Sequence, residues 1–360
     1  MPTTVEDPDD DVLVIACDES GSEGEELTAS QHPVFVHASV NLSADEATDL
    51  RDWMRGATRT QAPEMKSKTA LRPGNRQILL EMLDRLAGAA SITLVDKSYF
   101  LTSKLIETLI GPHALQWDTN IGTSGYGRAW ADHLNRHAPT ALGVARWDAF
   151  LSTYNALVRS YQREGTTPPS VLPFFAALDD AYENCSDDDT RYILSLLQQS
   201  QMFAYEYQGR SEVELRELDP LMPTMSGAAR NWAMRIGDAP FTFLADTYSG
   251  LTPTVRRYIV EASCTPLSVA GNIVPTPNLR GISLADSRTD ARIQLADILA
   301  GVGREVARLA MADSFDDELQ VAVHEMLDIN VMASSGSPLD VLVDRRPLRY
   351  YDDWMASRRA

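Results

Sequence analysis

The sequence predicts a mixed α/β fold, on three observations. Short apolar runs rich in β-branched residues, such as 12–17, have the length and composition of buried strands. Segments with a helical spacing of apolar residues lie between these runs, and 289–310 is the clearest of them. Between 111 and 235 the strand pattern is absent while helical spacing continues. We therefore expect a mixed sheet flanked by helices and interrupted by a large, mainly helical insertion.

The first half of the expected sheet lies in residues 12–110. A strand over 32–42 has the spacing of an antiparallel partner for 12–17. Ser43 is expected to cap the helix that follows, with Glu46 three residues on as its capping-box partner. Three further elements are expected before the insertion: a loop over 61–69, a helix over 75–86 and a strand over 91–96.

The second half of the expected sheet begins with a strand over 240–246. This strand repeats the plan of the first, because an apolar run delivers an aspartate and Ser-Gly follows shortly after it. A helix over 254–262, a strand that leads to Asp286 and the long helix over 289–310 complete it. The expected parts are an acidic disordered tail over 1–11, the first part of the sheet domain over 12–110, the insertion over 111–235, the second part over 236–312 and a C-terminal extension over 313–360.

The composition is that of a globular protein with one large or two ordinary domains. The chain has 360 residues, of which 44% are hydrophobic, and a domain usually takes about 150 residues. No apolar run approaches the roughly 18 residues of a membrane-spanning helix, and the start, MPTTVEDPDD, lacks the features of a secretory signal. We expect a cytoplasmic protein with no membrane partner. The three cysteines are far apart and predict neither a disulfide framework nor a thiolate zinc site.

The charge limits how the chain can contact nucleic acid. The net charge is -19 at pH 7, and residues 1–26 hold ten acidic side chains and no basic one. Such a surface repels phosphates at long range, which argues against broad non-specific binding to DNA or RNA. Local basic patches and contacts bridged by a metal ion are still compatible with it.

Carboxylates at the ends of elements are the residues that indicate chemistry. They are Asp18, Glu19, Asp246 and Asp286 at the ends of expected strands, and Asp297 inside the long helix. Open α/β sheets place their sites at such strand ends. Carboxylate oxygens suit Mg²⁺ or Mn²⁺, and three or four of them can hold two ions about 4 Å apart for displacement at a phosphodiester. An aspartate after a strand is also a common helix cap or turn former.

Five motifs, in this order along the chain, carry a resemblance to a known family. They are DESG at 18–21, EMK at 64–66, VDK at 95–97, the strand that ends in Asp246, and QLAD at 294–297. On these motifs the chain resembles the domain-of-unknown-function 3800 family over about 12–305, outside the helical insertion. The resemblance implies a ribonuclease H-like fold and a metal-dependent nuclease, of a kind associated with defence against mobile elements.

The resemblance also implies a role for each aspartate. Asp18 and Asp246, on neighbouring parallel strands, would bridge the metal ions. Asp297, with Gln294 on the same helical face, would supply the acid that ribonuclease H-like sites take from their last helix. Asp286 would bind metal or cap that helix.

Two further catalytic candidates have two interpretations each. Lys66 would contact the scissile phosphate or be a solvated loop lysine. Glu19 points to the opposite face of its strand if the strand continues, and curls back toward the site if a turn begins there. The first helix carries no obvious glutamate for the site, since Glu46 lies in its first turn and Glu64 lies beyond its end.

Other enzyme classes fit the sequence less well. A restriction-endonuclease-like motif of Asp18, Glu64 and Lys66 needs the last two on a strand, but a proline precedes them and their neighbours are not strand formers. His133 and His137 lie four apart on an expected helix without the glutamate of a zinc-protease motif, which indicates a surface pair. The sequence contains no phosphate-binding loop and no nucleophile elbow.

The main alternative is a ribonuclease H-like module without catalysis, whose insertion binds a protein partner or a second copy of the chain. The insertion holds 15 of the 27 aromatic side chains, and their helical spacing favours a core over a stacking surface for single-stranded nucleic acid. Against this alternative, several carboxylates in one site are costly to retain unless a cation neutralises them. We therefore expect a nuclease that uses Mg²⁺ or Mn²⁺ and acts on RNA or DNA.

Overall fold

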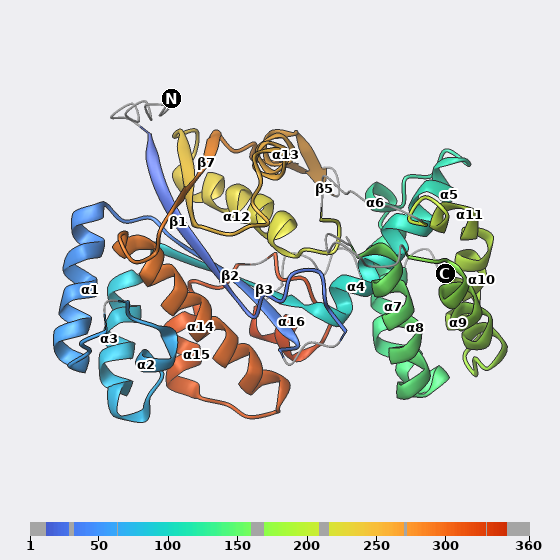
Figure 1. Ribbon diagram of the computed structural model, residues 1–360, viewed down its shortest axis with the longest axis horizontal. Coiled ribbons are helices and arrows are strands. Elements are labelled where there is room, and N and C mark those ends of the chain that lie inside the picture. The colour runs from blue at the N-terminus through green and yellow to red at the C-terminus, as the bar shows by residue number, and fades with distance from the viewer. Residues whose placement is uncertain are drawn as a thin grey trace. The chain divides into compact units, whose positions relative to one another are not determined.

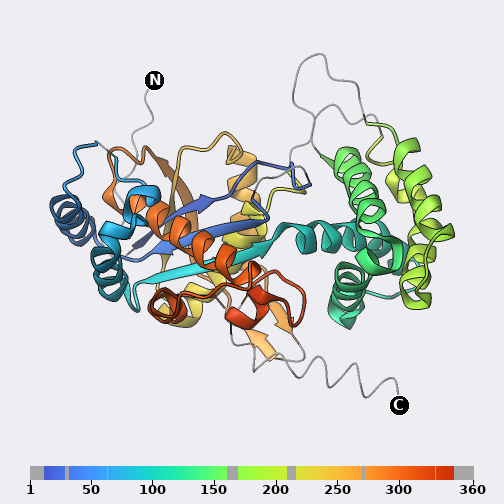
Figure 2. The same cartoon turned by 90° about the horizontal axis from the view of Figure 1, so that it is seen from below.

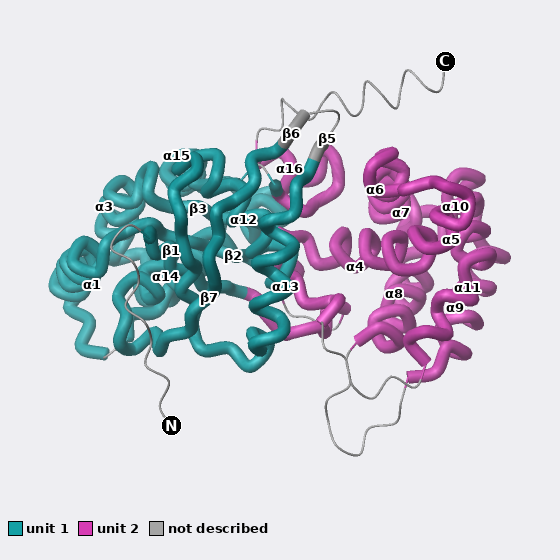
Figure 3. Tube along the Cα trace, turned by 90° about the horizontal axis from the view of Figure 1, so that it is seen from above, with its two compact units in different colours: residues 1–20, 36–94, 221–330 teal, residues 21–35, 95–220, 331–360 magenta. Residues whose placement is uncertain are grey.

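The computed structural model divides into two compact units, shown in different colours in Figure 3. Unit 1 comprises Met1–Ser20, Val36–Leu94 and Leu221–Asn330, and unit 2 comprises Gly21–Phe35, Val95–Pro220 and Val331–Ala360. The residues that the structure describes are 12–28, 32–62, 64–159, 169–208, 216–269, 272–328 and 330–343. The expected disordered tail over 1–11 lies outside them.

A five-stranded mixed sheet runs in the order β3-β2-β1-β4-β7. Its strands are β1 Leu13–Ser20, β2 Val34–Val40, β3 Ala90–Asp96, β4 Phe241–Asp246 and β7 Leu279–Ala285. β1 pairs with β2 antiparallel and with β4 parallel, and β4 pairs with β7 parallel. The strands over 12–17, 32–42 and 240–246 were expected in this pairing. The structure confirms an α/β fold built on a mixed sheet with flanking helices.

Helices cover both faces of the sheet in unit 1 (Figure 1). One face carries α1 Ala44–Thr58, α2 Ser67–Ala70, α3 Arg76–Leu86, α14 Ala291–Met311 and α15 Asp317–His324. The other face carries α12 Leu221–Ile236 and α13 Pro253–Cys264. Figure 2 shows α14 lying across the strands, where it packs on β1 and is buried along most of its length. Ser43 and Glu46 form the expected capping box at the start of α1.

The first strand is longer than the apolar run predicts. Its parallel pairing with β4 extends to Cys17, opposite Ala245. Its antiparallel pairing with β2 continues through Asp18 and Glu19 to Ser20, opposite Val36. Of the two interpretations of Glu19, the structure therefore shows the one in which the strand continues, because β2 still offers backbone partners after β4 has ended.

Apart from the ends of β2 and β3 that fall within it, the regular elements of unit 2 in the described residues are helices. They are α4 Lys97–Leu105, the π-helical turn Ile106–Ile110, α5 Gly111–Leu115, α6 Ile121–Ser124, α7 Tyr126–Leu142, α8 Val144–Val158, α9 Leu172–Glu183, α10 Asp188–Gln199, α11 Gln201–Ala204 and α16 Pro338–Leu342. Trp147, Phe150, Tyr154 and Phe174 are almost wholly buried and form an aromatic core. Aromatic residues at helical spacing in this segment therefore mainly fill the interior.

The boundary of the helical unit differs from the expected 111–235. The longest segment of unit 2 runs from Val95 to Pro220, and α12 belongs to unit 1 instead. Trp232 of α12 donates its Nε1–H to Ser39 Oγ at 2.8 Å, and Asn231 donates to Ser91 Oγ at 2.8 Å. These hydrogen bonds to side chains of β2 and β3 attach α12 to the sheet of unit 1.

The expected C-terminal extension is divided between the units. Residues 313–330 stay with unit 1, where α15 packs on α3. The extension also pairs with β3 through Ile92, whose N–H donates to Met326 O at 2.7 Å and whose carbonyl accepts from Asp328 N at 2.7 Å. A two-stranded sheet of β5 Leu267–Val269 and β6 Asn272–Val274 completes the regular structure. Of the helices that the structure describes, none has the length and apolar character needed to cross a membrane.

Candidate active site

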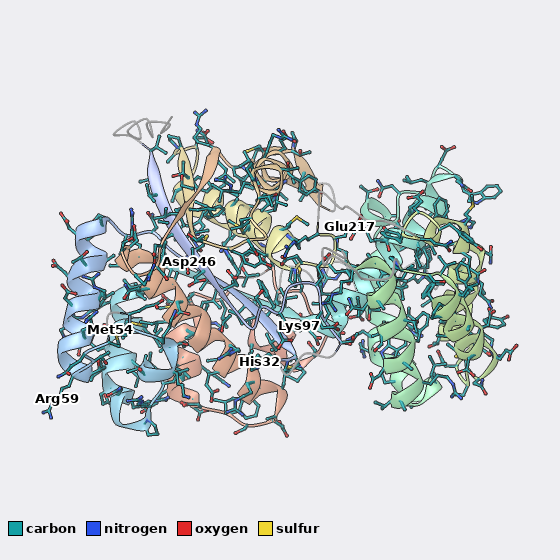
Figure 4. All side chains as sticks on the ribbon, viewed as in Figure 1. His32, Met54, Arg59, Lys97, Glu217 and Asp246 are labelled. Carbon is teal, nitrogen blue, oxygen red and sulfur yellow. The ribbon has the colours of Figure 1, made fainter. Side chains whose placement is uncertain are left out.

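Two aspartates lie at the same end of the sheet, where the parallel pairing of the adjacent strands β1 and β4 stops. The last parallel pair between β1 and β4 is Cys17 with Ala245, so Asp18 and Asp246 are the next residue of each strand. Asp246, labelled in Figure 4, accepts hydrogen bonds at Oδ1 from Thr247 N at 2.7 Å and from Ser287 N at 3.1 Å. Because parallel strands end together, the sequence plan of strand followed by aspartate places these two carboxylates side by side.

Asp297 comes to this end of the sheet from α14, the helix that packs on β1. Its side chain is 19% exposed. The backbone N–H of Ser67 donates to its carboxylate, but Oδ2 is buried without a hydrogen-bond partner in the described structure. A buried carboxylate oxygen with no donor is costly, and a bound cation is one way to satisfy it.

The loop before α2 adds Glu64 and Lys66 to the site. Lys66 Nζ contacts Glu64 and lies 3.9 Å from Asp297 Oδ2. Glu64 Oε1 also accepts a hydrogen bond from Ser287 Oγ at 3.1 Å. The loop is anchored by Met65, which is fully buried between these two polar residues. Glu64 is thus the site residue that the sequence did not assign, because it lies beyond the end of the first helix.

Gln294 joins the two loops that border the site. Its Oε1 accepts from Met65 N at 3.4 Å, and its Nε2 donates to Ser287 O at 2.8 Å. The side chain is buried, at 1% exposure. Gln294 therefore binds the backbone of Met65, next to Glu64, and the backbone of Ser287. Ser287 in turn contacts both Glu64 and Asp246. The QLAD motif supplies this contact and the Asp297 carboxylate from one face of α14.

The carboxylates influence one another electrostatically. Burial raises the pKa of Asp18 to about 8, and the negative charges of Glu19, Asp297 and Asp246 add to the rise. Burial also raises the pKa of Asp297. The ammonium of Lys66 opposes that rise, while Glu64 and Asp246 add to it. Groups that perturb each other in this way lie close together, and such perturbed acids are typical of functional sites.

Glu19 does not share the face of the sheet that carries Asp18. In the antiparallel register Asp18 is opposite Ala38 and Glu19 is opposite His37. Successive side chains of a strand alternate between its faces, so Glu19 lies on the face of His37 and Asp18 on that of α14. Because β1 continues through Glu19, the Glu19 side chain lies on the opposite face of the sheet from Asp297 of α14.

Asp286 follows β7, as expected, but it does not cap α14. The N-cap of α14 is Asp290, whose side chain accepts from Arg292 N. The carboxylate of Asp286 instead binds the guanidinium of Arg288 and accepts from Arg288 N at 2.9 Å. These hydrogen bonds lower the pKa of Asp286 to about 2. Its capping role is excluded, and its carboxylate is occupied by a local ion pair.

The donor chemistry of the site fits a hard divalent cation. Asp18, Glu64, Asp246 and Asp297 supply carboxylate oxygens, which are the ligands that Mg²⁺ and Mn²⁺ prefer. As the side chains stand, however, no three His, Cys, Asp or Glu residues of the described chain are arranged to hold one metal ion. Lys66 contacts two of these acids, Glu64 and Asp297. Binding of a divalent ion would therefore require these side chains to reorient, and Lys66, with its side chain 53% exposed, has room to leave.

Comparisons of the chain with protein-family models, with curated proteins and with solved structures gave no match. The site itself therefore carries the functional argument. Its features are four acids from β1, β4, α14 and the loop before α2, together with one lysine, all within unit 1.

Proposed function

We propose that this chain is a divalent-metal-dependent nuclease of ribonuclease H-like type, which hydrolyses phosphodiester bonds of RNA or DNA. One observation carries the proposal: Asp18 and Asp246 directly follow the last parallel pair of β1 and β4, and the helix that packs on β1 brings Asp297, whose buried Oδ2 accepts no hydrogen bond in the described structure, to the same place. The resemblance to the domain-of-unknown-function 3800 family supports the same assignment, including a role in defence against mobile elements.

Each side chain of the site has a role in this proposal. Asp18, Asp246 and Asp297 hold Mg²⁺ or Mn²⁺, and Glu64 is the fourth acid. A divalent cation bound there would neutralise the acids and polarise a phosphate as a Lewis acid. Ser287 fixes Asp246 and Glu64 through its N–H and its hydroxyl. Lys66, released from Glu64, presents its ammonium to the phosphate backbone.

The negative net charge agrees with a site that recruits its substrate locally. A chain of charge -19 repels nucleic acid at long range. The cations of the site therefore supply the attraction at short range, and we expect low affinity for nucleic acid when divalent ions are removed.

A second candidate function is a ribonuclease H-like module that binds a protein partner through its helical unit. Large apolar side chains are exposed on that unit, among them Trp117 at 74% and Leu172 at 70% exposure. Exposed apolar groups of this size are found at interaction surfaces as well as on ordinary surfaces. The absence of a formed metal-binding group in the described residues also agrees with a site that is not catalytic.

A cleavage assay separates the two functions. Labelled single-stranded and duplex RNA and DNA are incubated with the chain in Mg²⁺, in Mn²⁺ and in EDTA, and the double variant D18N/D246N is compared with D286N. Asp286 is a matched control, since it also follows a strand of the same sheet but binds Arg288. We expect metal-dependent cleavage by the wild type and by D286N, and none by the double variant. Cleavage that persists in D18N/D246N, or no cleavage of any substrate with either ion, would contradict the nuclease.

A further inference from the structure

The helical unit contains a second group of metal-ligating residues, separate from the carboxylates of unit 1. His133 and His137 lie four residues apart on α7, a helix of 17 residues, and this spacing places them on one face. Their rings are stacked, with centroids 4.6 Å apart and planes inclined by 26°. His133 is 20% exposed and His137 is exposed, so both rings are accessible from solvent.

A carboxylate orients the first of these rings. Nε2 of His133 lies 3.2 Å from Asp187 Oδ2 and 3.1 Å from Thr190 Oγ1. Asp187 is itself fixed as the N-cap of α10, where it accepts from Thr190 N at 2.7 Å. In the tautomer that carries its proton on Nε2, His133 donates toward this carboxylate and keeps the lone pair on Nδ1. This is the arrangement in which a carboxylate holds a metal-binding histidine in its tautomer and orientation.

The remaining ring nitrogens have no competing partner. In the part of the chain that the structure describes, no hydrogen bond engages Nδ1 of His133 or either ring nitrogen of His137. In the stacked arrangement the in-plane lone pairs of the two rings run side by side, so one ion is chelated only when the exposed ring of His137 turns about its side-chain bonds. Two imidazoles brought together in this way suit Zn²⁺, Ni²⁺ or Cu²⁺. Hard ions such as Mg²⁺ prefer oxygen ligands and would not compete for this pair.

We propose that His133 and His137 bind one transition-metal dication, with Asp187 as the positioning residue of His133. The protein supplies two ligands, because no group of three His, Cys, Asp or Glu residues is arranged around an ion among the described residues. The other coordination positions are open to water or to a ligand from a partner molecule. Since Asp187 belongs to α10 and both ligands belong to α7, bound metal also couples these two helices.

Calorimetric titration of the untagged, full-length chain with Ni²⁺ tests this site. We expect one Ni²⁺ per chain, with binding lost in H133Q/H137Q and kept in H324Q, which changes an exposed histidine at the end of α15. D187N should weaken binding by about tenfold or more, as loss of an orienting carboxylate does. D18N/D246N should bind Ni²⁺ at this site as the wild type does, which separates it from the carboxylates of unit 1.

The outcomes decide the site and the orienting role independently of nuclease activity. Equal Ni²⁺ binding by the wild type and H133Q/H137Q, or no stoichiometric binding by the wild type, would overturn the site. Binding that depends on both histidines but is unchanged in D187N would overturn the role of Asp187. Failure of the nuclease proposal leaves this titration unaffected, because the two sites share no residue.

Discussion

The Nζ atom of Lys66 lies 3.9 Å from Oδ2 of Asp297, a buried oxygen that receives no hydrogen bond in the described structure. The same ammonium contacts Glu64. Lys66 therefore serves as the cation of the acidic site when no divalent ion is bound. A divalent ion that binds Asp297 and Glu64 has to displace this contact, so the lysine and the metal compete for the same carboxylates.

Replacing Lys66 by methionine should strengthen divalent-ion binding. The variant removes the competing charge and keeps the length of the side chain, so we expect Mn²⁺ affinity to rise by roughly tenfold, which corresponds to about 1.4 kcal/mol. Under the proposed function nucleic-acid cleavage should fall, because the proposed contact of the ammonium with the phosphate is lost. Electron paramagnetic resonance of free Mn²⁺ measures the affinity. Lys68, on the short helix α2 that follows Lys66, is exposed, and K68M should leave the affinity unchanged. Equal effects of K66M and K68M would show that Lys66 does not compete.

Replacing Asp18 by asparagine should stabilise the metal-free protein at high pH. The pKa of Asp18 is raised to about 8 from 3.8, so the folded state prefers the protonated acid. Folding stability from this group is present below about pH 4 and is lost as the pH rises toward 8. In EDTA, the melting temperature of D18N should therefore exceed that of the wild type by an amount that grows over this range.

Added Mg²⁺ should reverse the order of the two proteins. A ligand that binds only the folded state stabilises it, and D18N lacks one of the carboxylates that we propose as ligands of the ion. Thermal unfolding of both proteins with EDTA and with excess Mg²⁺ measures both effects. An Mg²⁺-induced rise in melting temperature of the same size in D18N and in the wild type would argue against Asp18 as a ligand.

The sequence was sufficient for the parts of the site that depend on local signals. The apolar runs before Asp18 and Asp246 predicted two strands that each deliver an aspartate, and the structure confirms both as β1 and β4. That these strands are parallel neighbours was implied by the family resemblance, and β1 and β4 do pair in this way. The capping box of Ser43 and Glu46 fixed the start of α1. The two strands and the helix cap depend on residues within a few positions of one another, so pattern and propensity were enough to find them.

The parts that the sequence did not predict depend on tertiary contacts. Glu64 enters the site because Met65 is buried and Gln294, 229 residues away, binds its backbone. Glu19 lies on the other face because β2 continues to pair with β1 after β4 has ended. Neither contact has a local signal in the sequence. The pattern alone could therefore not place Glu64 in the site or show that β1 continues past Asp18.

Gly301 is the close-packing position that holds the Lys66 loop against α14. A Cβ atom at Gly301 would lie 2.1 Å from Cβ of Ser67, whose N–H binds Asp297. G301A should therefore displace α2, lower the free energy of unfolding by about 1–3 kcal/mol and weaken Mn²⁺ binding. Urea unfolding and the Mn²⁺ titration measure these two effects.

Gly227 provides the matched control for G301A. It lies inside α12, where a Cβ atom would meet nothing within 4 Å. G227A should stabilise the protein by about 0.5–1 kcal/mol, since alanine restricts the unfolded chain and favours helix. Similar effects of the two substitutions would show that the approach of Ser67 to α14 does not constrain the site.

His37 should make folding sensitive to mild acid. Burial lowers its pKa from 6.5 to about 4, and neither ring nitrogen has a hydrogen-bond partner in the described structure, although Glu19 lies opposite it on β1. Because the folded state disfavours the charged ring, stability is fully present above about pH 6.5 and falls as the pH approaches 4. Between about pH 7.5 and 5 the loss from this group should be about 2 kcal/mol. Urea unfolding of the wild type and H37L over this range measures the loss. H37L should lose about 2 kcal/mol less than the wild type, and equal losses would mean that His37 is not held neutral.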